Sequence, residues 1–120
     1  MFITNKQKFF VAIVAMLILL TPSLLFAWTG EVKYIEDGDT FDISRHGKEI
    51  SIRFYGVDCP ESDQFYGRKA TQLTKTMINR ETVKIEEIGE GPYGRPIAMV
   101  YHDGVCLNKK LVAEGLAWFG

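Results

Sequence analysis

A strand that ends at a glycine break is the feature that most constrains the fold of this chain. Ile50, Ile52 and Phe54 alternate with more polar residues, which is the period-two pattern of a strand with one buried face. Gly56 interrupts this pattern, and Pro60 favours a stiff, extended segment after it. We therefore expect one face of this strand to lie in a core and its far end to be held rigidly.

Three charged residues accompany this strand and its rigid end. Arg53 lies on the outward face of the strand, and Asp58 and Glu61 follow the glycine. A cation and two carboxylates carried close together by one rigid element indicate a functional site. The alternative is an ordinary strand with a polar edge.

The first 27 residues have a different character from the rest. Lys6 and Lys8 precede a continuous apolar run of 12 residues, Phe9 to Leu20. This order is typical of a secretory signal peptide, with cleavage expected after Ala27. The run is shorter than the roughly 20 residues that a membrane-spanning helix needs. We expect an exported protein, periplasmic or extracellular, without stable membrane association; the alternative is an anchor formed by an uncleaved N-terminal segment.

Residues 28–120 form the predicted domain, and their charge excludes one mode of binding. They contain 12 Lys and Arg against 15 Asp and Glu, a net charge of −3, because two of the 14 basic residues lie in the leader. Such a domain has no overall basic field to attract nucleic acid. Any phosphate binding has to come from a few placed arginines or from a metal ion.

Two cysteines, Cys59 and Cys106, remain in the predicted domain. Outside the cytoplasm such a pair often forms a disulfide. The sequence does not fix their geometry, so both a disulfide and two free thiols stay open.

Hydrophobic periodicity predicts a mainly β domain with α-helices. Alternating patterns predict five strands, over residues 30–35, 40–44, 49–57, 82–88 and 97–101. A three- and four-residue apolar period predicts a helix over 64–79. A short helix is expected to begin at Asn108 as its N-cap and to end near Gly115. Five strands with a helix after the third predict a small closed Greek-key barrel, the OB-fold.

Aspartates at two predicted turns are candidate metal ligands. Asp37 and Asp39 lie in the first hairpin turn, and Asp58 lies after the third strand. Oxygen ligands of this kind suit a hard cation such as Ca²⁺. The segment is no EF-hand, because Asp42 occupies the loop position that requires glycine. A cation site would have to be assembled from separate turns; the alternative is that these aspartates only form turns.

Arg53, Arg95 and Glu61 supply the other groups that phosphodiester hydrolysis needs. Guanidinium groups match the negative charge that develops on the phosphate, and a carboxylate orients or deprotonates the attacking water. Arg95 lies in a loop rich in glycine and proline. Its alternative role is an ordinary solvated loop charge. Tyrosines at 55, 66 and 93 are candidates for stacking on a base, or for half-buried packing.

The order and spacing of these motifs resemble the thermonuclease family, also called staphylococcal-nuclease-like. The matching segments are Asp37-Gly38-Asp39-Thr40, Arg53 to Glu61, Tyr66-Gly67 and Tyr93-Gly94-Arg95. The resemblance extends over residues 28–120. Each motif is unspecific by itself, and their combination is specific.

The resemblance implies a role for each of these residues. Asp39, Asp58 and the backbone carbonyl of Cys59 would bind Ca²⁺. Arg53 and Arg95 would bind the scissile phosphate, and Glu61 would act as the base or orient the water. Asp37 and Thr40 would support these groups, and Tyr93 would lie near the nucleotide.

The implied function is that of a monomeric, secreted, Ca²⁺-dependent nuclease that cleaves DNA and RNA and leaves 3′-phosphates. The family usually continues beyond the position of Gly120 with a third helix, so we expect a C-terminally truncated domain. Two other functions stay open: a noncatalytic OB-fold module that binds nucleic acid or protein, and an inactive nuclease remnant.

Overall fold

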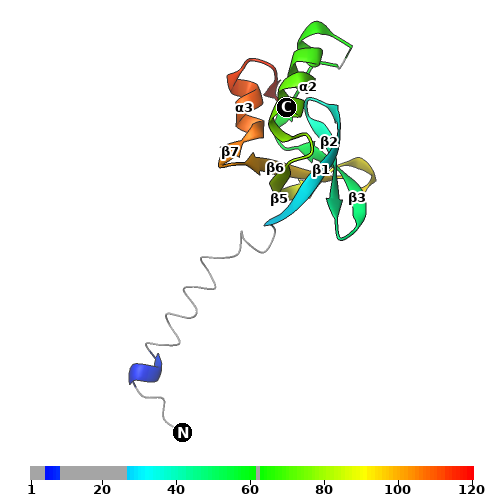
Figure 1. Cartoon of the computed structure of the whole chain (residues 1–120). Coiled ribbons are helices and arrows are strands. Elements are labelled where there is room, and N and C mark those ends of the chain that lie inside the picture. Colours follow the sequence, from blue (N-terminus) through cyan, green and yellow to red (C-terminus); the bar gives the residue numbers. More distant parts are fainter. Residues whose placement is uncertain (1–4, 9–26, 62) are drawn as a thin grey trace.

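The computed structural model describes residues 5–8, 27–61 and 63–120 (Figure 1). Nearly all of the predicted signal peptide lies outside the described residues, so the signal peptide and the domain boundary stay predictions. Among the residues described, no helix combines the length and the apolar character that crossing a membrane requires.

Five strands build the core of the fold. They are β1 (Ala27–Asp37), β2 (Thr40–Arg45), β3 (Lys48–Phe54), β5 (Thr82–Glu90) and β6 (Pro96–His102). The sheet runs in the order β3-β2-β1-β5-β6, and a parallel pairing of β3 with β6 joins its two ends. The predicted mainly β fold with a closed five-stranded barrel is therefore confirmed.

The alternating residues of the strands fill the inside of this barrel. Ile43, Ile52 and Val100 are completely buried, and the rings of Phe41 and Phe54 meet edge to face at 5.5 Å. Burial of such side chains is the main favourable term in folding a domain of this size.

Two helices lie together at one end of the barrel (Figure 1). They are α2 (Phe65–Ile78) and α3 (Leu107–Ala113). The remaining elements are short: β4 (Val57–Asp58), η2 (Pro92–Gly94), β7 (Val105–Cys106) and β8 (Trp118–Phe119). The predicted helix over 64–79 is confirmed, since α2 differs from it by one residue at each end.

Two sequence-based expectations about local structure are wrong. The third strand was expected to run to Val57, but β3 ends at Phe54 because Gly56 has a φ of 71° and turns the chain. The chain resumes as β4, which pairs with β8. No strand was predicted at Trp118–Phe119, because two residues carry no periodic signal.

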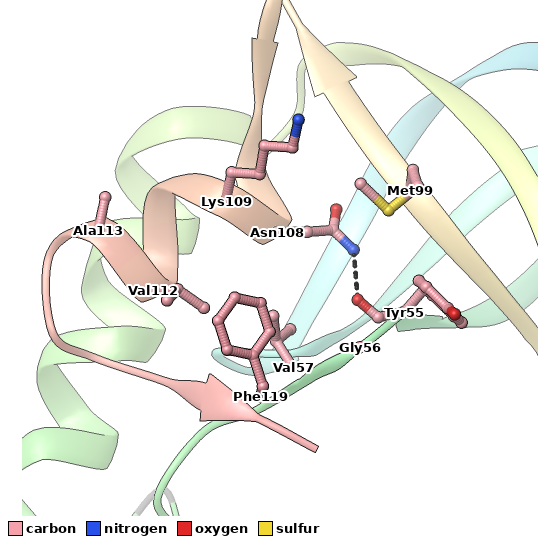
Figure 2. Close-up of a pocket in the computed structure, with 9 residues that line it drawn as sticks. All are labelled: Tyr55, Gly56, Val57, Met99, Asn108, Lys109, Val112, Ala113 and Phe119. Carbon is pink, nitrogen blue, oxygen red and sulfur yellow. Dashed lines mark hydrogen bonds between the residues drawn. The ribbon is translucent and has the colours of Figure 1, made fainter.

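Asn108 was expected to cap α3, and this is also wrong: Cys106 is the N-cap residue. The buried Asn108 side chain accepts a hydrogen bond from the backbone N–H of Val100 at 2.9 Å. It donates to the carbonyl oxygens of Tyr55 and Ala98 at 2.9 and 3.1 Å. Figure 2 shows the bond to Tyr55 beside a pocket of about 340 Å³. The asparagine thus links α3 to β6 and to the turn after β3.

Candidate active site

The turn between β1 and β2 has the tight geometry that its sequence predicts. Asp37 pairs with Thr40 across the hairpin, and an Asp37 side-chain oxygen accepts a hydrogen bond from the backbone N–H of Asp39 at 3.0 Å. This side-chain bond to the backbone two residues on is why aspartate favours turns. Asp37 thereby orients the turn that carries Asp39.

Helix α2 fixes this turn from behind. A Cβ atom at Gly38 would lie 2.7 Å from the Cβ of Ala70 and 2.8 Å from the sulfur of Cys59, so only glycine fits there. The hydroxyl of Thr74 donates a hydrogen bond to the Gly38 carbonyl oxygen at 2.9 Å. The turn therefore sits rigidly on the helix.

Asp39 points into the protein from this turn and is 3% exposed. One carboxylate oxygen accepts a hydrogen bond from the backbone N–H of Cys59 at 3.0 Å. The other accepts a hydrogen bond from the Thr40 hydroxyl at 3.1 Å and forms an ion pair with Arg53 at 3.0 Å. Burial raises the pKa of Asp39 most, and the neighbouring Asp37 raises it further.

Arg53 joins the two carboxylates that the sequence singled out. Its Nη1 lies 3.0 Å from Asp39, while its Nη2 contacts Asp58 and also donates to the Val57 carbonyl oxygen at 3.3 Å. A backbone hydrogen bond from Phe54 to the Asp39 carbonyl oxygen, 2.9 Å long, holds the end of β3 against the hairpin turn. Residues 19 positions apart in sequence are thus brought together by one guanidinium, as the sequence predicted.

Asp58 lies where β4 meets β8. It pairs with Trp118, and the Gly120 backbone N–H donates to the Gly56 carbonyl oxygen at 3.2 Å. The Gly120 backbone approaches the Asp58 carboxylate so closely that a side chain there would overlap it. The C-terminal residues therefore form one wall beside Asp58.

Arg95 lies in the loop just before β6. It is two residues before Ile97, which pairs with Arg53 of β3, so this loop lies at the end of β6 that runs beside β3. Among the described residues, the buried Nε of Arg95 has no hydrogen-bond partner. Arg95 and Tyr93 line a pocket of about 690 Å³ together with Ser51.

Tyr93 has a fully exposed side chain and a positive φ of 63°. A positive φ is unfavourable for a residue with a large side chain, and such strain concentrates at functional sites. The structure therefore presents this ring to solvent at the edge of the Arg95 pocket, as expected of a side chain near a nucleotide.

Glu61 is exposed and its side chain has no described contact with the Asp39–Arg53–Asp58 cluster. Its backbone is held firmly, because its carbonyl oxygen accepts a hydrogen bond from Gln64 at 2.9 Å and rests on Gly67 of α2. A Cβ atom at Gly67 would lie 1.7 Å from that oxygen. The structure thus places Glu61 beside the cluster's supporting helix but not in contact with the cluster.

Cys59 and Cys106 are both free thiols in the structure, so the disulfide option is not supported. The Cys59 sulfur packs at Gly38, whereas the Cys106 sulfur lies 3.8 Å from a side-chain oxygen of Asn108. Burial, and then the charges of Asp39 and Asp37, raise the pKa of Cys59 to about 12. The residue is a packing group whose backbone carbonyl remains a candidate metal ligand.

The described residues contain no cluster of three or more His, Cys, Asp or Glu side chains suited to a metal ion. A cation here would be held by the carboxylates of Asp39 and Asp58 with backbone carbonyl oxygens and water, a ligand set of the kind Ca²⁺ accepts.

Sequence reasoning missed the contacts that position the site. Gly38 and Gly67 occur in the motifs quoted above, but their close contacts, and the hydrogen bond from Thr74 to the Gly38 carbonyl oxygen, were not predicted. The one available signal was a glycine inside a predicted helix, since such a glycine costs stability unless packing requires it.

Comparison with known proteins adds three findings. The profile of the family described as "Staphylococcal nuclease homologue" matches residues 51–120. The chain is 33% identical over 102 residues to an "Uncharacterized endonuclease" of Escherichia coli O157:H7, covering 78% of this chain and 67% of that protein. It is 35% identical to a "Micrococcal nuclease" of Shigella flexneri (77% and 60% covered) and 37% identical to a "Thermonuclease" of Staphylococcus intermedius (72% and 56% covered). The chain thus spans 56–67% of the length of these relatives.

The raised pKa of Cys59 predicts a pH dependence of stability. The ordinary pKa of a cysteine thiol is 9.0, so the unfolded thiol ionises near pH 9, whereas the pKa of the folded Cys59 thiol is about 12. Because only the unfolded thiol ionises between pH 9 and about 12, the free energy of unfolding falls as the pH rises through this range, and the stabilisation is complete below pH 9. Urea unfolding in metal-free buffer should show this loss, and Cys59→Thr should lack it. A Cys106→Ser variant is the matched control and should lose stability as the unmodified protein does.

The contact of Gly67 with Glu61 predicts the sign of a helix substitution. Gly→Ala at an unrestrained helix position would stabilise by about 1 kcal/mol. Gly67→Ala should instead destabilise by about 1–3 kcal/mol, because the methyl group displaces the Glu61 backbone. Urea unfolding measures the difference, with the exposed Gln72→Ala in the same helix as control. A stabilised Gly67→Ala variant would contradict the described contact.

Proposed function

Since the chain belongs to the staphylococcal nuclease homologue family, we propose that it is a Ca²⁺-dependent nuclease that hydrolyses DNA and RNA and leaves 3′-phosphates. Membership confirms the resemblance to thermonucleases and makes the protein a nuclease, which is a phosphodiester hydrolase. Its cation, its products and its site of action belong to the proposal.

The observation that carries the proposal is the guanidinium of Arg53 between Asp39 and Asp58. Such an arrangement holds two carboxylates from separate turns close together at the end of β3. A binding barrel needs cations for phosphates but has no need of two converging carboxylates. The arrangement therefore favours a metal-dependent hydrolase over a noncatalytic module.

The carboxylates fit a calcium ion. Burial raises the pKa of Asp39, so the hydrogen bonds and the ion pair to Arg53 do not fully compensate its negative charge. A divalent cation would compensate it, and Asp58 and the Cys59 carbonyl oxygen would complete the protein ligands. When bound, the ion supplies Lewis-acid polarisation of the phosphate.

The two arginines bind the phosphate. An arginine has five N–H donors, and the described contacts of Arg53 use three of them. Its remaining donors, with the Arg95 guanidinium from the loop before β6, neutralise the charge that develops on the phosphate oxygens. Held by Asp39 and Asp58, Arg53 needs no reorganisation when the charge appears.

Glu61 takes the proton of the attacking water. The water oxygen forms a bond to phosphorus, the bond from phosphorus to the 5′ oxygen breaks, the 5′ oxygen leaves as a hydroxyl with a proton from solvent, and the phosphate stays on the 3′ oxygen. Gly67 and Gln64 fix the Glu61 backbone, so side-chain rotation alone has to bring the carboxylate to the water.

Export is part of the proposal, as is action as a monomer. The apolar run of Phe9 to Leu20 after Lys6 and Lys8 supports a cleaved leader. In the structure β1 begins at Ala27, so the proposed cut falls at the edge of the barrel. N-terminal sequencing of the protein from the culture medium or periplasm tests this, and an intact Met1 in that fraction would contradict cleavage.

The proposed roles predict the effect of removing one carboxylate. Glu61→Gln keeps the size of the side chain and one acceptor oxygen but cannot take up the proton, so the rate of DNA cleavage should fall by about 10²–10⁴-fold. Cleavage of single-stranded DNA is measured with Ca²⁺ and with chelator, and the products are tested for 3′-phosphate ends. The chelator should abolish cleavage, and the melting temperature of the variant should match the unmodified protein.

The exposed Glu49→Gln is the matched control and should cleave normally. Full activity of Glu61→Gln would refute its role as base. Cleavage in chelator would refute calcium dependence, and binding without any cleavage would favour a noncatalytic module.

A further inference from the structure

One face of helix α2 carries only basic and neutral side chains. At 100° per residue, Phe65, Arg68 and Lys69 lie on the side of the helix opposite to the buried Ala70 and Thr74. The exposed Gln72 and Thr76 continue that side toward the end of the helix, and the exposed Lys75 and Tyr66 lie on its two flanks. No Asp or Glu occurs from residue 64 to residue 80, although the whole chain has a net charge of −1.

The positive charge on this face is not neutralised within the part of the chain that the structure describes. The ion pairs of the described residues use basic side chains outside α2, namely Lys33, Arg45, Arg53, His102 and Lys110. The described polar contact of the Arg68 guanidinium is a 2.7 Å hydrogen bond to the backbone oxygen of Asp63, which leaves its charge in place. The charge of the face is therefore available to an anionic partner.

Two aromatic rings lie at the start of the same helix. Phe65 and Tyr66 are 56% and 58% exposed, and their rings meet edge to face with centroids 5.2 Å apart. The Lys69 ammonium lies 4.8 Å from the Phe65 ring centroid. Exposed rings beside lysine and arginine match the bases and phosphates of an unpaired nucleic acid strand, because every base has a face that stacks.

Helix α2 links this surface to the candidate active site. On the buried side of the helix, Gly67 touches the Glu61 backbone and Thr74 bonds to the turn that carries Asp39. At the start of the helix, the Gln64 backbone N–H donates to the Glu61 carbonyl oxygen at 2.9 Å. A strand on the exposed side would therefore come near Glu61 at the start of α2, where the two aromatic rings lie.

We propose that Phe65, Tyr66, Arg68, Lys69 and Lys75 form an accessory binding surface for a single-stranded nucleic acid. The surface holds nucleotides beyond the cleaved phosphodiester, so long strands bind more tightly than dinucleotides. This inference rests on the proposed nuclease function for the identity of the strand. Unpaired bases are required because the rings stack only on bases that a duplex hides.

Binding without turnover tests the surface. The purified protein is titrated in chelator into a fluorescently labelled 20-nucleotide single strand and into a labelled dinucleotide, and anisotropy reports the affinity. Lys69→Gln/Lys75→Gln should weaken binding of the 20-nucleotide strand about 10-fold and reduce the salt dependence of log K by about 1.4, at ~0.7 per phosphate contact. Phe65→Ala/Tyr66→Ala should weaken it by a similar factor with little change in salt dependence.

The matched control is Lys48→Gln/Lys109→Gln, which removes the same charge from exposed positions outside α2 and should bind as the unmodified protein does. Thermal melting confirms that the variants fold. Equal weakening by the control pair would show a general charge effect and overturn the proposal. Unchanged binding by the α2 variants, or no binding of the 20-nucleotide strand by the unmodified protein, would also overturn it. This binding experiment does not depend on cleavage. If the cleavage assay described above finds no activity while the 20-nucleotide strand still binds, the nuclease function is refuted and this surface remains supported.

Discussion

The ion pairs of Arg53 with Asp39 and Asp58 are the interaction on which the candidate site depends. One carboxylate is buried in a hairpin turn and the other lies on a two-residue strand after a glycine turn. Removing one partner of a buried charge pair leaves a charge without compensation, at a cost of several kcal/mol. The guanidinium therefore fixes the mutual position of two turns and also keeps donors in reserve for an anion.

Helix α2 serves two purposes with its two sides. Its buried side carries small residues, and Gly67 and Ala70 let the backbones of Glu61 and Gly38 come close. Its exposed side carries cations, and the helix itself contains no acidic residue. One rigid element thus supports the candidate site on one side and carries the proposed binding surface on the other.

The sequence predicts most of the barrel because its strands bury one face, and alternation at residues such as Ile50, Ile52 and Phe54 reports that burial directly. It also predicts that Asp39, Arg53 and Asp58 come together. It fails where contacts are nonlocal and leave no period: β8 against β4, and Asn108 as a buried link rather than a cap. Glu61 remains apart from the cluster in the structure, so its role rests on chemistry and family membership.

Calorimetric calcium titration tests directly whether the carboxylates of Asp39 and Asp58, held by Arg53, form the proposed calcium site. The unmodified protein should bind one Ca²⁺, and Asp39→Asn and Asp58→Asn should each weaken binding at least ~10-fold, because affinity depends on the charge of the ligands. Asp42→Asn, on the adjacent strand β2, should bind as the unmodified protein does. Equal calcium affinity of all four proteins, or the absence of binding by the unmodified protein, would show that Asp39 and Asp58 do not form a calcium site.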